Sequence, residues 1–282
     1  MSVVITLTSM LGFTSGPAGF GVEYVIGGQG LTSRGRETAA QMLAEDAMRI
    51  RCGKSPILDR WRARRDNQDP GGSSTDGVVA TYAGIGFGLP DRDPATTDHL
   101  QGLVAELMWN RLINEREDCS GGRQLVKAHS VKPDPLEPGG DGLVIYVVGD
   151  TYVFRLWEIK KHDAASKPVS ATIRRASKQL ASRGNEYLAK LAGPETIEQG
   201  GPLGDFYANI VELWLDGSDR AGVGVSVGTS AAHAPARPAA FNSILTEFPQ
   251  FNRTGQVESV VVAVPDFPSF ATRVREIVWS GL

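Results

Sequence analysis

The sequence predicts an α/β fold, in which a mixed central sheet is flanked by helices and extended by extra elements at both ends. Short apolar runs rich in β-branched and aromatic residues predict strands, most clearly at 143–148, 152–160 and 258–264. Apolar residues that recur with a period of 3.6 predict helices at 36–51, 99–117 and 171–191. Helices are therefore expected on either side of the central strands in the sequence.

Length and composition bound the domain organisation. A chain of 282 residues is long enough for one large or two small domains. We expect an N-terminal α/β extension at 1–90, packed on a core at 91–282. The net charge of −3 argues against a strongly basic nucleic-acid coat, although not against local basic patches. Two cysteines, Cys52 and Cys119, form no C-x-x-C pair and predict reduced thiols.

The first ninety residues are predicted to alternate between strands, a helix and loops. Glycine-rich turns separate two expected strands, and Thr32 or Ser33 is expected to cap the first helix. The stretch 66–77 is rich in Asp, Gly and Ser and predicts a loop. The expected strands of this part lie at 2–7, 22–26 and 78–89.

The most basic run of the chain is RWRARR at 60–65. One interpretation is phosphate contact, with Trp61 stacking on a base. The other is a solvated helix face that Trp61 anchors to the core. The sequence leaves both open.

The helix predicted at 99–117 carries an acidic residue in an unusual setting. Thr97 or Asp98 is expected to cap it. Glu106 lies in a stripe with Trp109 and Ile113 rather than on the polar side of the helix. A strand at 124–129 is expected to follow.

A β-hairpin at 139–162 is the centre of the chain. A glycine-rich turn around Asp141 precedes the strand 143–148, and Gly149-Asp150 reverses the chain into the strand 152–160. Side chains alternate along a strand, so Glu158 and Lys160 share one face. Asp141 lies 17 residues before Glu158, which is the separation that two short strands and a tight turn bring together. Two carboxylates beside a lysine can hold a divalent metal ion.

The order Asp, hairpin, Glu-x-Lys resembles the PD-(D/E)xK nuclease superfamily, with Asp141, Glu158 and Lys160 as the matching residues. The resemblance covers about a third of the chain, 97–190. It implies a restriction-endonuclease-like fold and a Mg²⁺- or Mn²⁺-dependent nuclease acting on DNA. In such a site Asp141, Glu158 and the backbone carbonyl of Ile159 bind the metal, and Lys160 orients the attacking water. Glu106 corresponds to the additional acidic residue that the preceding helix often supplies in this superfamily.

The helix predicted at 171–191 follows the motif and is basic, which suits it to phosphate contacts. Gln179 matches the helical Gln of several superfamily members. The C-terminal third is expected to add strands at 221–227 and 258–264, a short helix at 241–248 and a closing helix at 267–279. The residues expected to contact nucleic acid are Arg174, Arg175, Lys178, Gln179 and Lys161.

The size of the chain and the place of the motif also resemble the nuclease subunits of anti-phage systems of the Hachiman type, which work with a helicase. That resemblance implies an effector subunit with a helicase partner. Two rivals stay open: a catalytically inactive binding module on the same fold, and a stand-alone restriction enzyme. No apolar run approaches the roughly 20 residues of a membrane span, and Arg34 is the first basic residue, so we expect a cytoplasmic protein without membrane contact.

Overall fold

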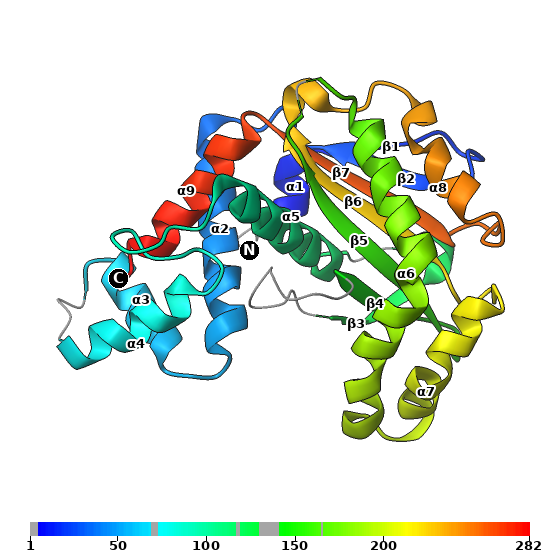
Figure 1. The fold of residues 1–282 in the computed structure, drawn as a ribbon, viewed down its shortest axis with the longest axis horizontal. Helices are drawn as coiled ribbons and strands as arrows, with labels where there is room; N and C mark the ends of the chain where they lie inside the picture. The colour runs from blue at the N-terminus through cyan, green and yellow to red at the C-terminus, as the bar shows by residue number, and fades with distance from the viewer. Residues whose placement is uncertain (1–4, 69–72, 117–118, 130–140, 165) are drawn as a thin grey trace.

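One seven-stranded mixed sheet organises the computed structural model, which describes residues 5–68, 73–116, 119–129, 141–164 and 166–282 (Figure 1). The strand order is β1-β2-β7-β6-β5-β4-β3. Strands β2, β7, β6 and β5 run parallel, while β4 and β3 continue the sheet antiparallel and β1 closes the other edge. The strand bounds are β1 Thr14–Ser15, β2 Glu23–Gly27, β3 Gln124–Ala128, β4 Gly142–Val148, β5 Thr151–His162, β6 Val223–Ser230 and β7 Val257–Val264.

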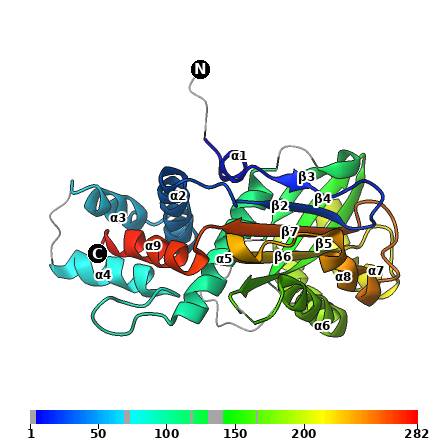
Figure 2. The ribbon, with the colours of Figure 1, turned by 90° about the horizontal axis from the view of Figure 1, so that it is seen from above.

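Helices cover both faces of this sheet and bury two separate apolar clusters. The first cluster joins Trp157 and Ile159 of β5 to helices α1, α2, α5 and α9. The second joins Phe154 and Leu156 of the same strand to α6, α7 and α8. Figure 2 shows α1 on one side of the sheet and α6 on the other. The helix bounds are α1 Leu7–Leu11, α2 Ser33–Cys52, α3 Ile57–Arg65, α4 Ser73–Gly84, α5 Thr97–Asn114, α6 Val169–Glu198, α7 Gly201–Leu215, α8 Asn242–Glu247 and α9 Phe267–Trp279.

The sheet curls strongly toward α5. Strands β2 and β3 are five strand spacings apart, which is about 24 Å across a flat sheet. Yet Arg123, directly before β3, donates to Glu23 of β2 over 3.2 Å. The sheet is therefore concave on its α5 face.

The expected strands of the central hairpin and the C-terminal third are present, as are the three long helices. Thr32 caps α2, as expected, whereas α5 begins at Thr97, two residues before the predicted start, and is capped by Thr96. The helix α6 continues past residue 191 to Glu198, and α7 fills an apolar stretch of the C-terminal third. The strands of the predicted extension at 1–90 join the common sheet, because β2 pairs with β7.

Two strand predictions in the first ninety residues were wrong. The stretch expected as a strand at 2–7 leads into α1, whose N-cap Thr6 accepts from the backbone N–H of Ser9; residues 1–4 lie outside the described ones. The stretch 78–89 contains most of α4 rather than a strand, and this helix also shortens the predicted loop at 66–77. Val79 and Ala83 lie four residues apart in α4 and are both buried, so the helical period decided the conformation over the β-branched composition.

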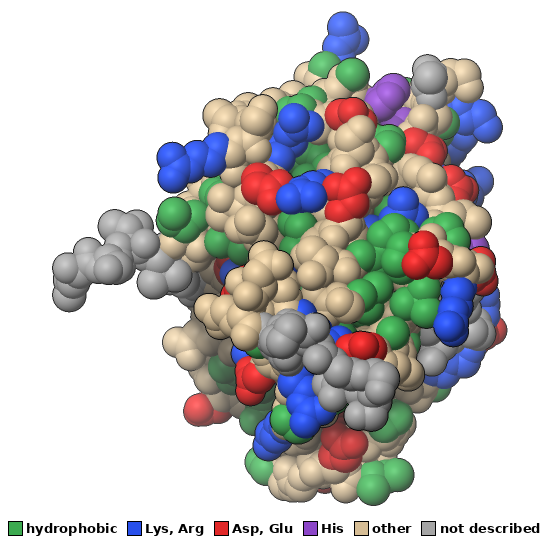
Figure 3. Space-filling model, turned by 90° about the vertical axis from the view of Figure 1, so that its left-hand side faces the viewer, with side chains coloured by type: hydrophobic (Ala, Val, Ile, Leu, Met, Phe, Trp, Pro, Cys, Tyr) green, Lys and Arg blue, Asp and Glu red, His purple; other side chains and the backbone are tan. Residues whose placement is uncertain are grey.

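The basic run 60–65 anchors a helix to the core. Trp61 is fully buried on α3 and donates from Nε1 to the Val278 carbonyl at the end of α9, over 2.8 Å. Arg62 and Arg65 pair with Glu45 of α2. Figure 3 views this end of the molecule and shows basic and acidic side chains interspersed. The anchoring interpretation is therefore the one that the structure supports.

Candidate functional site at the open edge of β5

The register of the central hairpin brings Asp141 beside Glu158. Gly142, the first residue of β4, is opposite Trp157, so the position before it is opposite Glu158. The carboxylate of Asp141 accepts from the backbone N–H of Ile159, with 2.8 Å between Oδ2 and N. Because β4 begins at Gly142 and β5 runs on to His162, no described strand pairs with the last residues of β5 on this side, which we call the open edge.

Lys160 completes the cluster. Its Nζ contacts Oε1 of Glu158 and lies 3.4 Å from Oδ2 of Asp141. The Glu158 side chain is fully buried, whereas those of Asp141 and Lys160 are 16% and 22% exposed. The predicted convergence of these three side chains is thus present in the structure. Solvent contacts the cluster through the exposed parts of Asp141 and Lys160.

Burial and mutual charge set the protonation of this cluster. Burial, reinforced by the charge of Asp141, raises the pKa of Glu158 to about 8 despite the neighbouring ammonium. Burial alone would lower the pKa of Lys160, but the two carboxylates outweigh it and the pKa of Lys160 lies above its ordinary value. Lys160 therefore keeps its positive charge at neutral pH, where it lies against both acids.

The donor set contains groups that a hard divalent cation binds. Among the described residues, neither carboxylate oxygen of Glu158 receives a well-directed hydrogen bond, although both are buried and Oε1 contacts Nζ of Lys160. The N–H of Ile159 points toward the open edge, and a strand residue presents its C=O on the same side as its N–H. Two carboxylates and one backbone carbonyl thus face one spot, as Mg²⁺ and Mn²⁺ prefer. Among the described residues, no group of three His, Cys, Asp or Glu side chains has a metal-binding arrangement.

Glu106 lies on α5 in a half-buried position. On this helix, Ala105 packs toward Gly228 of β6, and Trp109 packs on Gly142. The helix covers the face of β5 opposite Glu158. The role of Glu106 stays a prediction.

The residues expected to contact nucleic acid differ in their exposure and in the partners that they already have. Arg174, Arg175 and Lys178 are exposed on α6. The amide of Gln179 instead donates to the hydroxyl of Tyr187 on the same helix, over 2.9 Å. Lys161 pairs with two carboxylates, Asp98 at the start of α5 and Asp163.

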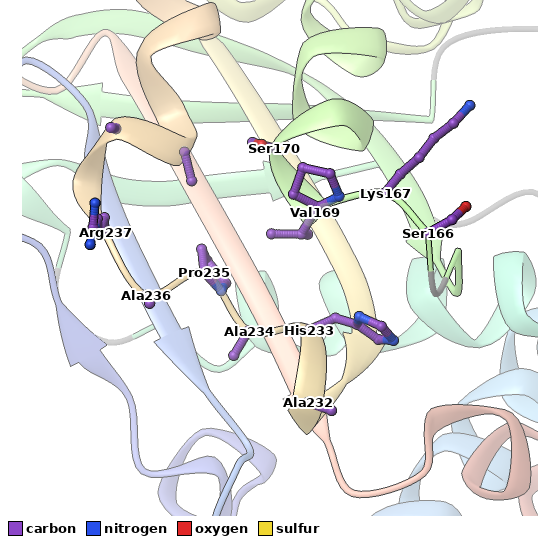
Figure 4. A pocket seen from close by; sticks show the side chains of 13 residues that line it. Ser166, Lys167, Val169, Ser170, Ala232, His233, Ala234, Pro235, Ala236 and Arg237 are labelled. Atoms are coloured by element: carbon purple, nitrogen blue, oxygen red, sulfur yellow. The ribbon is translucent and has the colours of Figure 1, made fainter.

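A groove beside the N-terminus of α6 adds residues that the sequence did not single out. It has a volume of about 610 Å³, and a second hollow of about 460 Å³ shares Lys167 with it and reaches Arg174. Figure 4 shows Lys167 on one side of the groove, Arg237 on the other, and His233 near its base. The groove follows the ends of β5 and β6. Ligands often bind at the carboxyl ends of parallel strands. A prediction of the strand order in the sheet would therefore have located this groove.

Comparison of the chain with protein-family models and with curated proteins finds no match. None of the helices in the described ranges is both long enough and apolar enough to cross a membrane. The geometry of the residues themselves therefore carries the functional argument.

Proposed function

We propose that this protein is a metal-dependent nuclease that hydrolyses phosphodiester bonds of DNA. The observation that carries the proposal is the cluster at the open edge of β5, where the Lys160 ammonium lies against the carboxylates of Glu158 and Asp141. Paired acids beside a lysine are the groups that metal-assisted phosphodiester hydrolysis needs.

The residues of the cluster have distinct roles in this proposal. Asp141, Glu158 and the carbonyl of Ile159 would hold Mg²⁺ or Mn²⁺, which when bound supplies a Lewis acid and a water of lowered pKa. Lys160 places a fixed positive charge beside the scissile phosphate and donates hydrogen bonds to the attacking water. The buried backbone of β5 keeps these groups preorganised, because Asp141 is tied to the N–H of Ile159.

The groove beside α6 supplies a path for the phosphate backbone. Lys167 and Arg174 are exposed, and no ion pair is found for either within the described ranges. Both belong to the segment that directly follows β5. We expect the double substitution Lys167→Gln with Arg174→Gln to weaken DNA binding for all sequences alike and to reduce the salt slope by about 1–2. Fluorescence anisotropy over a salt series measures this, with Arg183→Gln, whose arginine pairs with Glu186, as the control.

The test of catalysis compares matched variants on labelled duplex DNA with Mg²⁺ or Mn²⁺. Asp141→Asn and Lys160→Met should each lower the cleavage rate by about 100-fold or more, and circular dichroism checks that each variant is folded at the assay temperature. The controls are Asp150→Asn, at the far turn of the hairpin, and Lys190→Met, on the exposed side of α6. Cleavage at the wild-type rate by the Asp141 or Lys160 variant, with both controls active, refutes the assignment.

Metal binding separates the proposal from its rivals. Calorimetric titration with Mn²⁺ should show binding that Asp141→Asn abolishes; absence of binding by the wild-type chain favours an inactive binding module. Cleavage of specific duplex sites by the isolated chain favours a stand-alone restriction enzyme. Cleavage that appears only with a helicase supports the narrower proposal of an effector subunit in an anti-phage complex.

A further inference from the structure

Two of the four histidines meet at the base of the groove beside α6. His162 is the last residue of β5, and His233 belongs to the short 3₁₀ helix Ala231–His233 that follows β6. Their ring centres are 5.3 Å apart, and the ring planes are nearly perpendicular, at 81°. The parallel pairing of β5 with β6 thus brings together two imidazoles from separate segments of the chain.

One ring nitrogen of His162 has no partner. The residue is only 3% exposed. Its Nδ1 lies 2.8 Å from Oγ1 of Thr172, in the first turn of α6. Its Nε2 is fully buried, and no hydrogen bond to this atom is found among the described residues. A buried polar atom without a partner is costly, so Nε2 of His162 is a candidate to bind a ligand.

The surroundings of His162 are those of a metal-binding histidine. Such a residue binds its ion through one nitrogen and donates a hydrogen bond from the other nitrogen to a neighbouring oxygen, which fixes the tautomer and the orientation of the ring. Oγ1 of Thr172 is an oxygen of this kind. When Nδ1–H donates to it, Nε2 presents a lone pair, as a metal ion requires.

The spacing of the two rings fits one shared ion. Metal–nitrogen bonds of about 2.1 Å in a tetrahedral site place the centres of two imidazole rings about 5 Å apart. The observed separation of 5.3 Å agrees with this value. Figure 4 shows His233 extending toward the segment with Ser166 and Lys167, which joins β5 to α6. His233 lines the groove, so an ion at this point would be within reach of solvent.

The charges around the pair favour nitrogen ligands. Burial, followed by the proximity of His233, lowers the pKa of His162; Asp163 and the backbone of Lys167 oppose this shift without cancelling it. His162 is therefore neutral at neutral pH, which is the form that binds metal. Lys167 and Arg237 of the groove are exposed, so solvent and salt screen their repulsion of an ion. No carboxylate is found among the described residues that line this groove.

We propose that His162 and His233 together bind a borderline divalent ion, Zn²⁺ or Ni²⁺, with water in the remaining positions. Imidazole nitrogen suits these ions, whereas the Mg²⁺ or Mn²⁺ of the proposed nuclease site prefers oxygen ligands. The two sites share no ligand, so the proposal goes beyond nuclease activity and does not depend on it. A bound ion would link the end of β5 to the segment after β6 and would therefore stabilise the folded chain.

Calorimetric titration of the full chain without an affinity tag, carrying Asp141→Asn and in excess Mg²⁺, tests this site apart from the acidic cluster. The probes are Zn²⁺ and, separately, Ni²⁺. We expect one ion per chain. His233→Ala should weaken binding by at least about tenfold, because the loss of a ligand costs no less than the loss of a residue that orients one. The control is His99→Ala, which removes an exposed imidazole at the start of α5 and should leave the affinity unchanged.

Thermal unfolding gives a second measurement on the same variants. Saturating Ni²⁺ should raise the midpoint of the parent and of His99→Ala, but not that of His233→Ala. His233 is half-buried at the groove, outside both apolar clusters, so its replacement leaves the core intact. The proposal is overturned by the absence of Zn²⁺ and Ni²⁺ binding up to about 1 mM, by equal affinities of the parent and His233→Ala, or by loss of binding in His99→Ala.

Discussion

The buried carboxylate of Glu258 should be one of the most important single side chains for stability. At an effective dielectric constant of about 20, a unit charge at the distances of Arg116 and Arg123, 2.6 and 2.8 Å, attracts Glu258 by about 6 kcal/mol each. Much of this attraction is offset by the desolvation of the ions. Removing one partner of a buried ion pair typically costs about 3–5 kcal/mol, because the remaining charges stay buried. Glu258→Gln keeps the volume, removes the charge and leaves one acceptor oxygen where the carboxylate has two.

Urea denaturation at neutral pH in phosphate-free buffer measures this change. A loss of about 3–5 kcal/mol should lower the midpoint by about 1 M or more. The control is Asp219→Asn, which removes the exposed ion pair with Arg253 and should cost less than about 1 kcal/mol. A midpoint of the Glu258 variant within the range of the control would show that the stability of the fold does not depend on pairing the guanidinium groups with Glu258.

The pH dependence gives the same prediction a second test. The folded-state pKa of Glu258 lies below its ordinary value of 4.5, so the unfolded chain takes up a proton before the folded protein does. The stability that Glu258 contributes is therefore fully present above pH 4.5 and is lost as the pH falls through the folded-state pKa. The difference between the wild type and Glu258→Gln should shrink on acidification below pH 4.5. A difference that grows there contradicts the reasoning.

Two further predictions concern packing and protonation. Gly142→Ala should lower the free energy of unfolding in urea by about 1–3 kcal/mol, because a Cβ at this position of β4 would lie 2.1 Å from the Trp109 ring on α5. The control is Gly102→Ala at an open position of α5, which should instead stabilise the protein by up to about 1 kcal/mol. Burial lowers the pKa of His129 to about 4, so between pH 6.5 and 4 the unfolded chain binds a proton that the folded protein does not. Stability should therefore fall over this range by up to about 3 kcal/mol, and His129→Asn should flatten that part of a pH series of urea midpoints; an unchanged slope would contradict the assignment.

The central hairpin was predictable because its information is local. Alternation of apolar residues located both strands, and the spacing of Asp141 and Glu158 fixed their pairing once the turn was placed. The strand register then required Lys160 to follow on the same face. Nothing beyond 24 residues of sequence enters this argument, so the cluster could be derived without knowledge of the rest of the fold.

The features that sequence analysis missed depend on distant contacts. Arg123 and Glu258 are 135 residues apart and meet only because the sheet curls. Lys161, expected to contact DNA, pairs with Asp98, which is 63 residues earlier. In α4, strand-favouring Val78 and Val79 lie in a helix, since tertiary burial of one helical side outweighs local propensity. Curvature, long-range ion pairs and burial of this kind cannot be predicted from a short stretch of sequence.

The packing of the hairpin against α5 holds the acidic residues of the candidate site in register. Trp157 packs with Trp109 of α5 at 5.8 Å between ring centres, and Gly142 makes room for the same Trp109. Glu158 follows Trp157 in the sequence and points to the other face of the sheet. Asp141 directly precedes Gly142, where β4 begins. A slip of one residue would turn Trp157 away from Trp109 toward the α6-side cluster and would separate the acids at the same time. Core packing and the geometry of the candidate site therefore cannot vary independently. Changes at Trp109 should disturb both, whereas changes at Asp141 should leave the packing intact.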